Sequence, residues 1–180
     1  MDLRNLSLRE KVFQCMIMKP KMMKRNLTLE EYFEKYPVGG LYFAKGPVQD
    51  LAEMEPGEAS TSNAFIAKCR KAAKYPILIC ADGANIGDSG MPAVSKDALA
   101  ASPNAKKLAY DYGKSEGMQM NANDVDWLLG PCLDLAIFKH CNTISGTMSD
   151  DGEYTAELGV EIIRGIQEQN VAATIKHFPG

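Results

Sequence analysis

The sequence has little of what several large functional classes require. It contains no glycine-rich phosphate loop of the G-x-G-x-x-G or Walker type, which argues against a nucleotide-binding domain. No apolar run approaches the roughly 20 residues of a membrane-spanning helix, and residues 1–5 lack the apolar stretch of a signal peptide. A net charge of -3 gives no reason to expect nucleic acid or an anionic membrane as a partner.

Cysteine and histidine are few and scattered. The 5 cysteines are an odd number without C-x-x-C spacing, and three of them lie in apolar runs. These three are Cys15, Cys80 and Cys132. We therefore expect buried thiols in a reducing cytoplasm. His140, Cys141 and His177 lack the spacing of a zinc site, so the sequence predicts neither a metal nor a cofactor.

Short apolar runs alternate with segments of helical periodicity along the chain. The expected strands cover 15–18, 39–44, 76–81, 127–135 and 171–175. The expected helices begin at 7, 28, 62, 102 and 153, with a turn of helix near 96–101. Gly117 is expected to end the helix from 102, and its inward positions are Ala105, Leu108, Ala109 and Tyr112. This order of apolar strands and helices predicts a parallel sheet covered by helices.

Polar residues follow the expected strands. They are Asp82, Asp134, Lys176 and His177. A (β/α)₈ barrel carries its chemistry at the carboxyl ends of its strands, which this placement suits. The predicted fold class is α/β, a parallel (β/α) barrel of TIM type, incomplete, with about the first five β/α units.

The acidic segment Ser149-Asp150-Asp151 precedes the helix expected from residue 153. Acidic side chains at a helix start accept hydrogen bonds from free backbone N–H groups and stabilise the helix dipole. We therefore interpret this segment as a helix cap, not as a catalytic motif.

Five segments, in order, resemble the N-terminal barrel domain of glycoside hydrolase family 3, in its β-N-acetylhexosaminidase branch. They are Ser7–Gln14, Val38–Phe43, Pro76–Asp82, Gly130–Leu135 and Gly165–Gly180. The sequence Phe178-Pro179-Gly180 after Lys176-His177 favours this branch over the β-glucosidase branch. The resemblance covers nearly the whole chain, so residues 1–180 are interpreted as the N-terminal part of such a domain.

The resemblance implies a retaining hydrolase that removes terminal β-linked N-acetylglucosamine, with a carbohydrate partner and no cofactor. Lys176 and His177 would bind hydroxyls of the sugar beside the scissile bond, and Asp82 would bind hydroxyls at its far side. For Asp134 two roles stay open, substrate contact and anchoring of a loop.

Two departures from the family pattern leave alternatives open. Ala84 occupies the position of a glutamate in Asp-x-Glu-Gly-Gly, and Met148 that of a sugar-binding arginine. Loss of an arginine donor would weaken binding by about 1.5–3 kcal/mol. The alternatives are a non-catalytic sugar-binding or structural module, and a β-glucosidase-type member of the family.

The resemblance also implies that the catalytic aspartate and histidine lie beyond Gly180. A retaining glycosidase needs both a nucleophile and an acid/base. We therefore expect the 180-residue chain to be inactive alone. The open strand edges of an incomplete barrel further predict a homo-oligomer.

Overall fold

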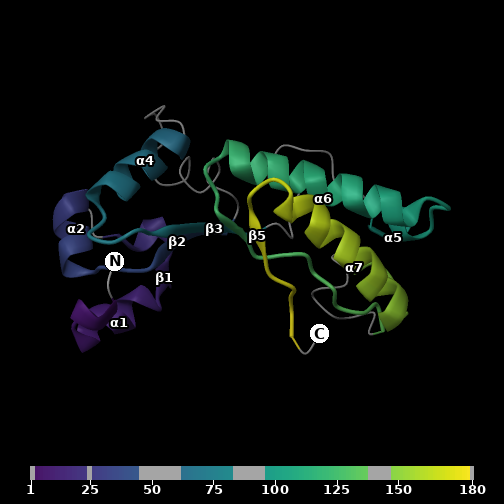
Figure 1. Cartoon of the computed structure of the whole chain (residues 1–180), viewed down its shortest axis with the longest axis horizontal. Coiled ribbons are helices and arrows are strands. Elements are labelled where there is room, and N and C mark those ends of the chain that lie inside the picture. The colour runs from purple at the N-terminus through teal and green to yellow at the C-terminus, as the bar shows by residue number, and fades with distance from the viewer. Residues whose placement is uncertain (1–2, 24–25, 45–61, 83–95, 138–146, 179–180) are drawn as a thin grey trace. The chain divides into compact units, whose positions relative to one another are not determined.

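The computed structural model describes residues 3–23, 26–44, 62–82, 96–137 and 147–178. The chain divides into two compact units, Met1–Ala81 and Asp82–Gly180 (Figure 1). Within the described ranges, no helix is both long and apolar enough to cross a membrane.

The described residues of the first unit form three parallel strands and three α-helices. Its elements are η1 (Leu3–Asn5), α1 (Leu8–Gln14), β1 (Ile17–Met18), η2 (Pro20–Met22), α2 (Leu29–Lys35), β2 (Gly40–Phe43), α4 (Ser62–Ala72) and β3 (Leu78–Ala81). Strand β2 lies between β1 and β3, and Gly40 is in register with both Ile17 and Leu78. The alternation of strand and helix expected from the sequence is confirmed here.

Helices α1 and α2 begin where the sequence predicts. Ser7 and Thr28 are their N-caps, and each forms a capping box with the glutamate three residues later. The side-chain oxygen of the cap accepts a backbone N–H, and the glutamate accepts the N–H of the cap residue. These reciprocal bonds satisfy donors that the first turn of a helix leaves free.

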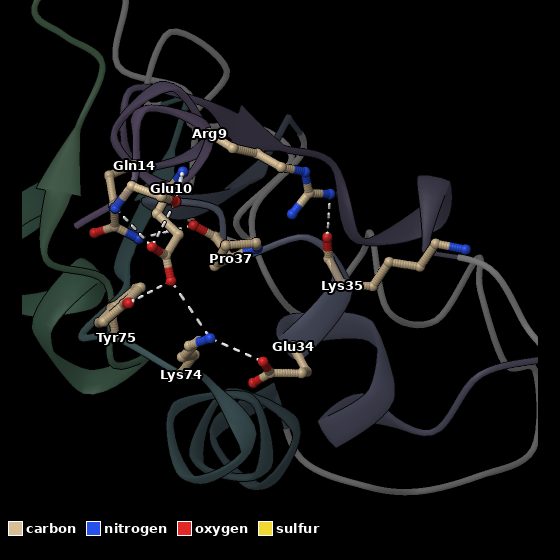
Figure 2. Close-up of polar contacts among 9 residues, drawn as sticks. Arg9, Glu10, Gln14, Glu34, Lys35, Pro37, Lys74 and Tyr75 are labelled. Atoms are coloured by element: carbon tan, nitrogen blue, oxygen red, sulfur yellow. Dashed lines mark hydrogen bonds and ion pairs between the residues drawn. The ribbon is translucent and has the colours of Figure 1, made fainter.

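A polar cluster around Glu10 joins α1 to the segment after α4 (Figure 2). The Glu10 carboxylate accepts hydrogen bonds from Ser7 Oγ at 2.6 Å and from Tyr75 Oη at 2.7 Å. Lys74 Nζ lies 3.4 Å from the same carboxylate and 2.8 Å from that of Glu34. The hydrogen bonds from Ser7 and Tyr75 lower the pKa of Glu10 to about 2.

Two sequence expectations are wrong in the first unit. Leu78 is 51% exposed, although the continuous apolar run 76–81 predicts a strand that is buried on both faces. It is the first residue of β3, and only the later positions of that strand are fully covered. Cys15 is also exposed, because it is the C-cap of α1 and precedes β1. Cys80 is buried, as expected.

The second unit is built on two long helices. Its elements are α5 (Lys96–Ala100), α6 (Ala105–Ala122), β4 (Trp127–Leu128), α7 (Gly152–Gln167) and β5 (Ala172–Ala173). Helix α6 begins at Ala105, two residues after the predicted first helical residue Pro103, and it continues past Gly117, so the predicted end there is wrong. Leu108 is 41% exposed and not inward as predicted, whereas Ala105, Ala109 and Tyr112 are buried.

Gly117 lies inside α6, where that helix packs closely against α7 (Figure 1). A Cβ atom on Gly117 would lie 2.8 Å from the carbonyl oxygen of Ile166. A Cβ atom on Gly113 would lie 2.1 Å from the carbonyl oxygen of Ile162. Both glycines therefore let two helix backbones approach, and this contact outweighs the helix-weakening effect of glycine.

Helix α7 begins at Gly152, one residue before the predicted start at 153. Asp151 is its N-cap, and Asp151 Oδ1 accepts a hydrogen bond from the Tyr154 N–H at 3.0 Å. The capping interpretation of the acidic segment is therefore confirmed. Leu158, Ile162 and Ile166 form the buried face of the helix.

Strands β4 and β5 are parallel, with Trp127 paired to Ala172 and Leu128 to Ala173. The regular pairing is shorter than expected and resumes at one bridge, Cys132 with Lys176, after the interruption at Gly130-Pro131. The apolar run 171–175 predicts a buried strand, yet within it only Val171 is buried. Among the described residues of this unit, β5 pairs with β4 alone, which leaves Ile175 53% exposed.

Candidate functional site

Backbone pairing beyond β4 and β5 positions the polar residues of the second unit. The Lys176 N–H donates to the Pro131 carbonyl at 3.0 Å, and the Leu133 N–H donates to the Lys176 carbonyl at 2.7 Å. This parallel register places residues 132–134 beside residues 176 and 177. Side chains that are 43 residues apart in sequence therefore meet at one end of the strand pair.

Asp134 holds His177 by two hydrogen bonds. Its Oδ1 accepts the His177 backbone N–H at 2.7 Å, and its Oδ2 lies 2.8 Å from the ring Nδ1. Asp134 is buried, whereas the His177 side chain is 56% exposed. A carboxylate at Nδ1 favours a proton on that nitrogen, which leaves Nε2 of the neutral ring as an acceptor. Asp134 thus holds both the backbone and the ring of His177, and its two expected roles stay predictions.

Lys176 and Asp82 form the second pair of the site. The Lys176 ammonium makes an ion pair and hydrogen bond with Asp82 Oδ1. The two side chains are largely covered, with 14% and 25% of their surfaces exposed. Partial burial strengthens a charge-assisted hydrogen bond. All four predicted site residues therefore fall into two adjacent pairs.

Glu116 is a buried acid of α6 that the sequence analysis did not single out. Its side chain is hydrogen-bonded to Tyr112, and the charges of Lys96, Lys176 and Asp82 act on it. Burial is the main cause that raises its pKa to about 7. The signal was present in the sequence, because residues 112 and 116 are one helical turn apart and Tyr112 was expected inward.

Cys132 lies against the carboxylate of Asp134. The thiol is buried and hydrogen-bonded to Asp134, and burial raises the pKa of the thiol. Cys132 Sγ, an Asp134 carboxylate oxygen and a His177 ring nitrogen all lie within 4.8 Å of one another. Sequence spacing did not reveal this group, because a strand pairing creates it.

Of the two departures from the family pattern, Ala84 and Met148, the structure describes only Met148. Met148 is buried, with 4% of its surface exposed. Ala84 lies outside the described residues, as do His140 and Cys141. A buried methionine offers no hydrogen-bond donor, so position 148 cannot supply the contact that an arginine would.

The sequence of the chain is similar to that of known proteins. A sequence model described as the glycosyl hydrolase family 3 N terminal domain matches residues 7–180. This chain belongs to glycosyl hydrolase family 3. The predicted family is therefore confirmed over almost the whole chain.

Two proteins with similar sequences have different names. The chain is 42% identical over 74 residues to a probable beta-glucosidase A of Neosartorya fischeri, covering 41% of this chain and 8% of that protein. It is 36% identical over 83 residues to a beta-hexosaminidase of Pseudomonas aeruginosa, covering 46% of this chain and 25% of that protein. The chain thus spans a minor part of both relatives, and their names do not decide the branch.

A solved structure agrees with the family. A glycosyl hydrolase family 3 member from Mycobacterium smegmatis aligns with a TM-score of 0.75 at 18% identity. The alignment covers 100% of this chain and 53% of that chain. The predicted fold class, an α/β chain with parallel strands of barrel type, is confirmed by this likeness.

Proposed function

We propose that this chain supplies the sugar-binding groups of a retaining glycoside hydrolase that removes terminal β-linked N-acetylhexosamine. One observation carries the proposal: His177, held by Asp134, is adjacent to Lys176, which is paired with Asp82. A sugar is neutral and rich in hydroxyls, each of which is both donor and acceptor. The histidine Nε2, the ammonium and the carboxylate are complementary to such groups.

The anchoring of these groups supports substrate positioning. Asp134 fixes the backbone and the ring of His177 at once, so the ring loses little further freedom when a ligand binds. Lys176 is oriented by Asp82 in the same way. Such preorganisation raises reactivity by holding the sugar in one geometry. We infer that Lys176, His177 and Asp82 bind substrate, and that Asp134 positions His177.

The choice of N-acetylhexosamine rests on the Lys-His-Phe-Pro-Gly ending and on the likeness to bacterial beta-hexosaminidases. A β-glucosidase is the second candidate, because the identity to a fungal beta-glucosidase is 42% over 74 residues. The buried Met148 supports a third outcome, a domain that binds sugar weakly.

The test is binding of free sugars to the purified chain, followed by nuclear magnetic resonance. We expect N-acetylglucosamine to perturb signals of residues 132–134 and 174–177 at lower concentration than glucose does. Lys176→Ala and His177→Ala should each weaken binding about tenfold or more, because each removes a hydrogen bond to a charged or oriented group. Lys107→Ala is the matched control, since Lys107 also pairs with an aspartate, Asp111, but on the exposed surface of α6.

The outcomes separate the candidates. Preference for glucose would favour the β-glucosidase reading, and equal weak binding of both sugars would favour a degenerate pocket. Absence of binding at high sugar concentration, with intact folding, would refute a sugar site. We also expect no hydrolysis of a chromogenic N-acetylglucosaminide, because the residues assigned here bind the sugar and do not attack it.

A further inference from the structure

Three side chains of different chemistry meet beside the β4–β5 pair. Cys132 and Asp134 are buried, with 3% and 6% of their surfaces exposed. The His177 side chain is 56% exposed. Their sulfur, oxygen and nitrogen atoms lie within 4.8 Å of one another. Thiolate, carboxylate and imidazole are the three side-chain ligands that Zn²⁺ takes in proteins.

We propose that Cys132, Asp134 and His177 bind a divalent transition-metal ion, best fitted by Zn²⁺, and that the bound ion excludes a sugar from His177. The group has the composition of a three-ligand site with a fourth position left for water. A soft thiolate combined with imidazole selects zinc-like ions over magnesium or calcium, which prefer oxygen ligands.

The geometry requires only a small rearrangement. Zinc holds sulfur at about 2.3 Å and nitrogen or oxygen at about 2.0–2.2 Å, so ligand atoms lie roughly 3.5 Å apart. The present upper separation of 4.8 Å therefore needs a movement of about 1 Å. Cys132 and Asp134 are held in the core, and the exposed ring of His177 is the side chain able to move.

Metal binding also redistributes protons in a defined way. The Cys132 thiol releases its proton to solvent and binds as thiolate. If the metal binds Nδ1 of His177, the proton on that nitrogen is replaced and the neutral ring carries its proton on Nε2. Asp134 binds through a carboxylate oxygen. Because a proton leaves with each ion bound, affinity should rise with pH.

Competition with sugar follows from shared atoms. The ring of His177 is proposed above to accept a hydrogen bond from a sugar hydroxyl. When Nδ1 is bound to the ion, the proton lies on Nε2, so the ring no longer accepts a hydrogen bond from a sugar hydroxyl. The ring has also turned away from the position in which Asp134 holds it for the sugar. The second part of the inference, exclusion of sugar, therefore rests on the proposed function, whereas metal binding itself does not.

The experiment adds Co²⁺ alone to the purified chain and records its absorption spectrum. We expect one equivalent to give thiolate-to-cobalt charge-transfer absorption and visible bands typical of four-coordinate cobalt, and Zn²⁺ to remove both. Cys132→Ser should abolish the charge-transfer absorption and weaken Zn²⁺ binding by about 100-fold or more. Cys15→Ser and Cys141→Ser are the matched controls and should leave the spectrum unchanged.

His177→Ala provides a second test that does not depend on a core substitution. Its side chain is exposed, so the variant should fold, as circular dichroism would check, and should lose the cobalt bands. A cobalt spectrum unchanged by both Cys132→Ser and His177→Ala would overturn the metal site. N-acetylglucosamine binding is measured separately with a chelator present. If the sugar does not bind, the metal-binding result can still be interpreted. Simultaneous binding of Zn²⁺ and sugar would overturn the exclusion.

Discussion

The buried carboxyl of Glu116 should make the second unit less stable as pH rises. Its pKa is raised from 4.5 to about 7, chiefly by burial. Between pH 4.5 and about pH 7, the Glu116 carboxyl loses its proton in the unfolded chain but keeps it in the folded chain. The free energy of unfolding therefore falls with rising pH across this window, and the loss is complete above the folded pKa.

The magnitude follows from the pKa. One pKa unit corresponds to about 1.4 kcal/mol. The change at Glu116 therefore lowers the free energy of unfolding by about 2–3 kcal/mol between pH 5 and pH 8. Such a loss is a large fraction of the 5–15 kcal/mol typical of a domain. Glu116→Gln keeps the size of the side chain and its hydrogen-bonding capacity toward Tyr112 but cannot ionise.

The assay is urea unfolding of the chain and the Glu116→Gln variant at several pH values from 5 to 8. We expect the variant to gain about 2–3 kcal/mol relative to the parent over this range, because all other titrating groups are common to both. Glu157→Gln is the control, since Glu157 is exposed and paired with Lys106 at 3.0 Å. Parallel profiles for the parent and Glu116→Gln would refute the reasoning.

Three further predictions concern the framework of the two units. Gly113→Ala should destabilise the chain by about 1–3 kcal/mol in urea unfolding, because its Cβ would meet the Ile162 carbonyl; a gain in stability would contradict the close packing. Asp151→Ala should cost about 1 kcal/mol through loss of the α7 cap, and an unchanged urea midpoint would argue against that cap. Glu10→Gln should flatten the acid-unfolding profile, because the lowered pKa of Glu10 gives stability above pH 4.5 that is lost as pH falls toward 2. A steeper acid-unfolding profile in the variant would contradict this prediction.

The local structure was largely determined by the sequence. The capping pairs Ser7 with Glu10 and Thr28 with Glu31 fixed two helix starts, because they act within one turn of the chain. The acidic cap Asp151 did the same for α7. Apolar runs located the five strands found in the described part of the chain, and thereby the α/β class. The sequence also indicated the family, because five segments resemble family segments in the same order. The family match covers residues 7–180.

Only the tertiary structure decided the limits of several elements. Gly117 lies inside α6 because the Ile162–Ile166 segment of α7 packs against that helix, a contact that no local pattern encodes. Ile175 and Leu78 are exposed although their segments are apolar, because burial depends on which neighbours cover a strand. Position along an apolar run does not contain that information.

The site shows the same division. The sequence placed Asp82, Asp134, Lys176 and His177 at strand ends, because polar residues after apolar strands are visible without coordinates. It did not pair Asp134 with His177 or Lys176 with Asp82, since those pairs depend on the register of Cys132 with Lys176. The same register brings the Cys132 thiol to the histidine. A long-range strand pairing therefore decided which of the polar groups act together.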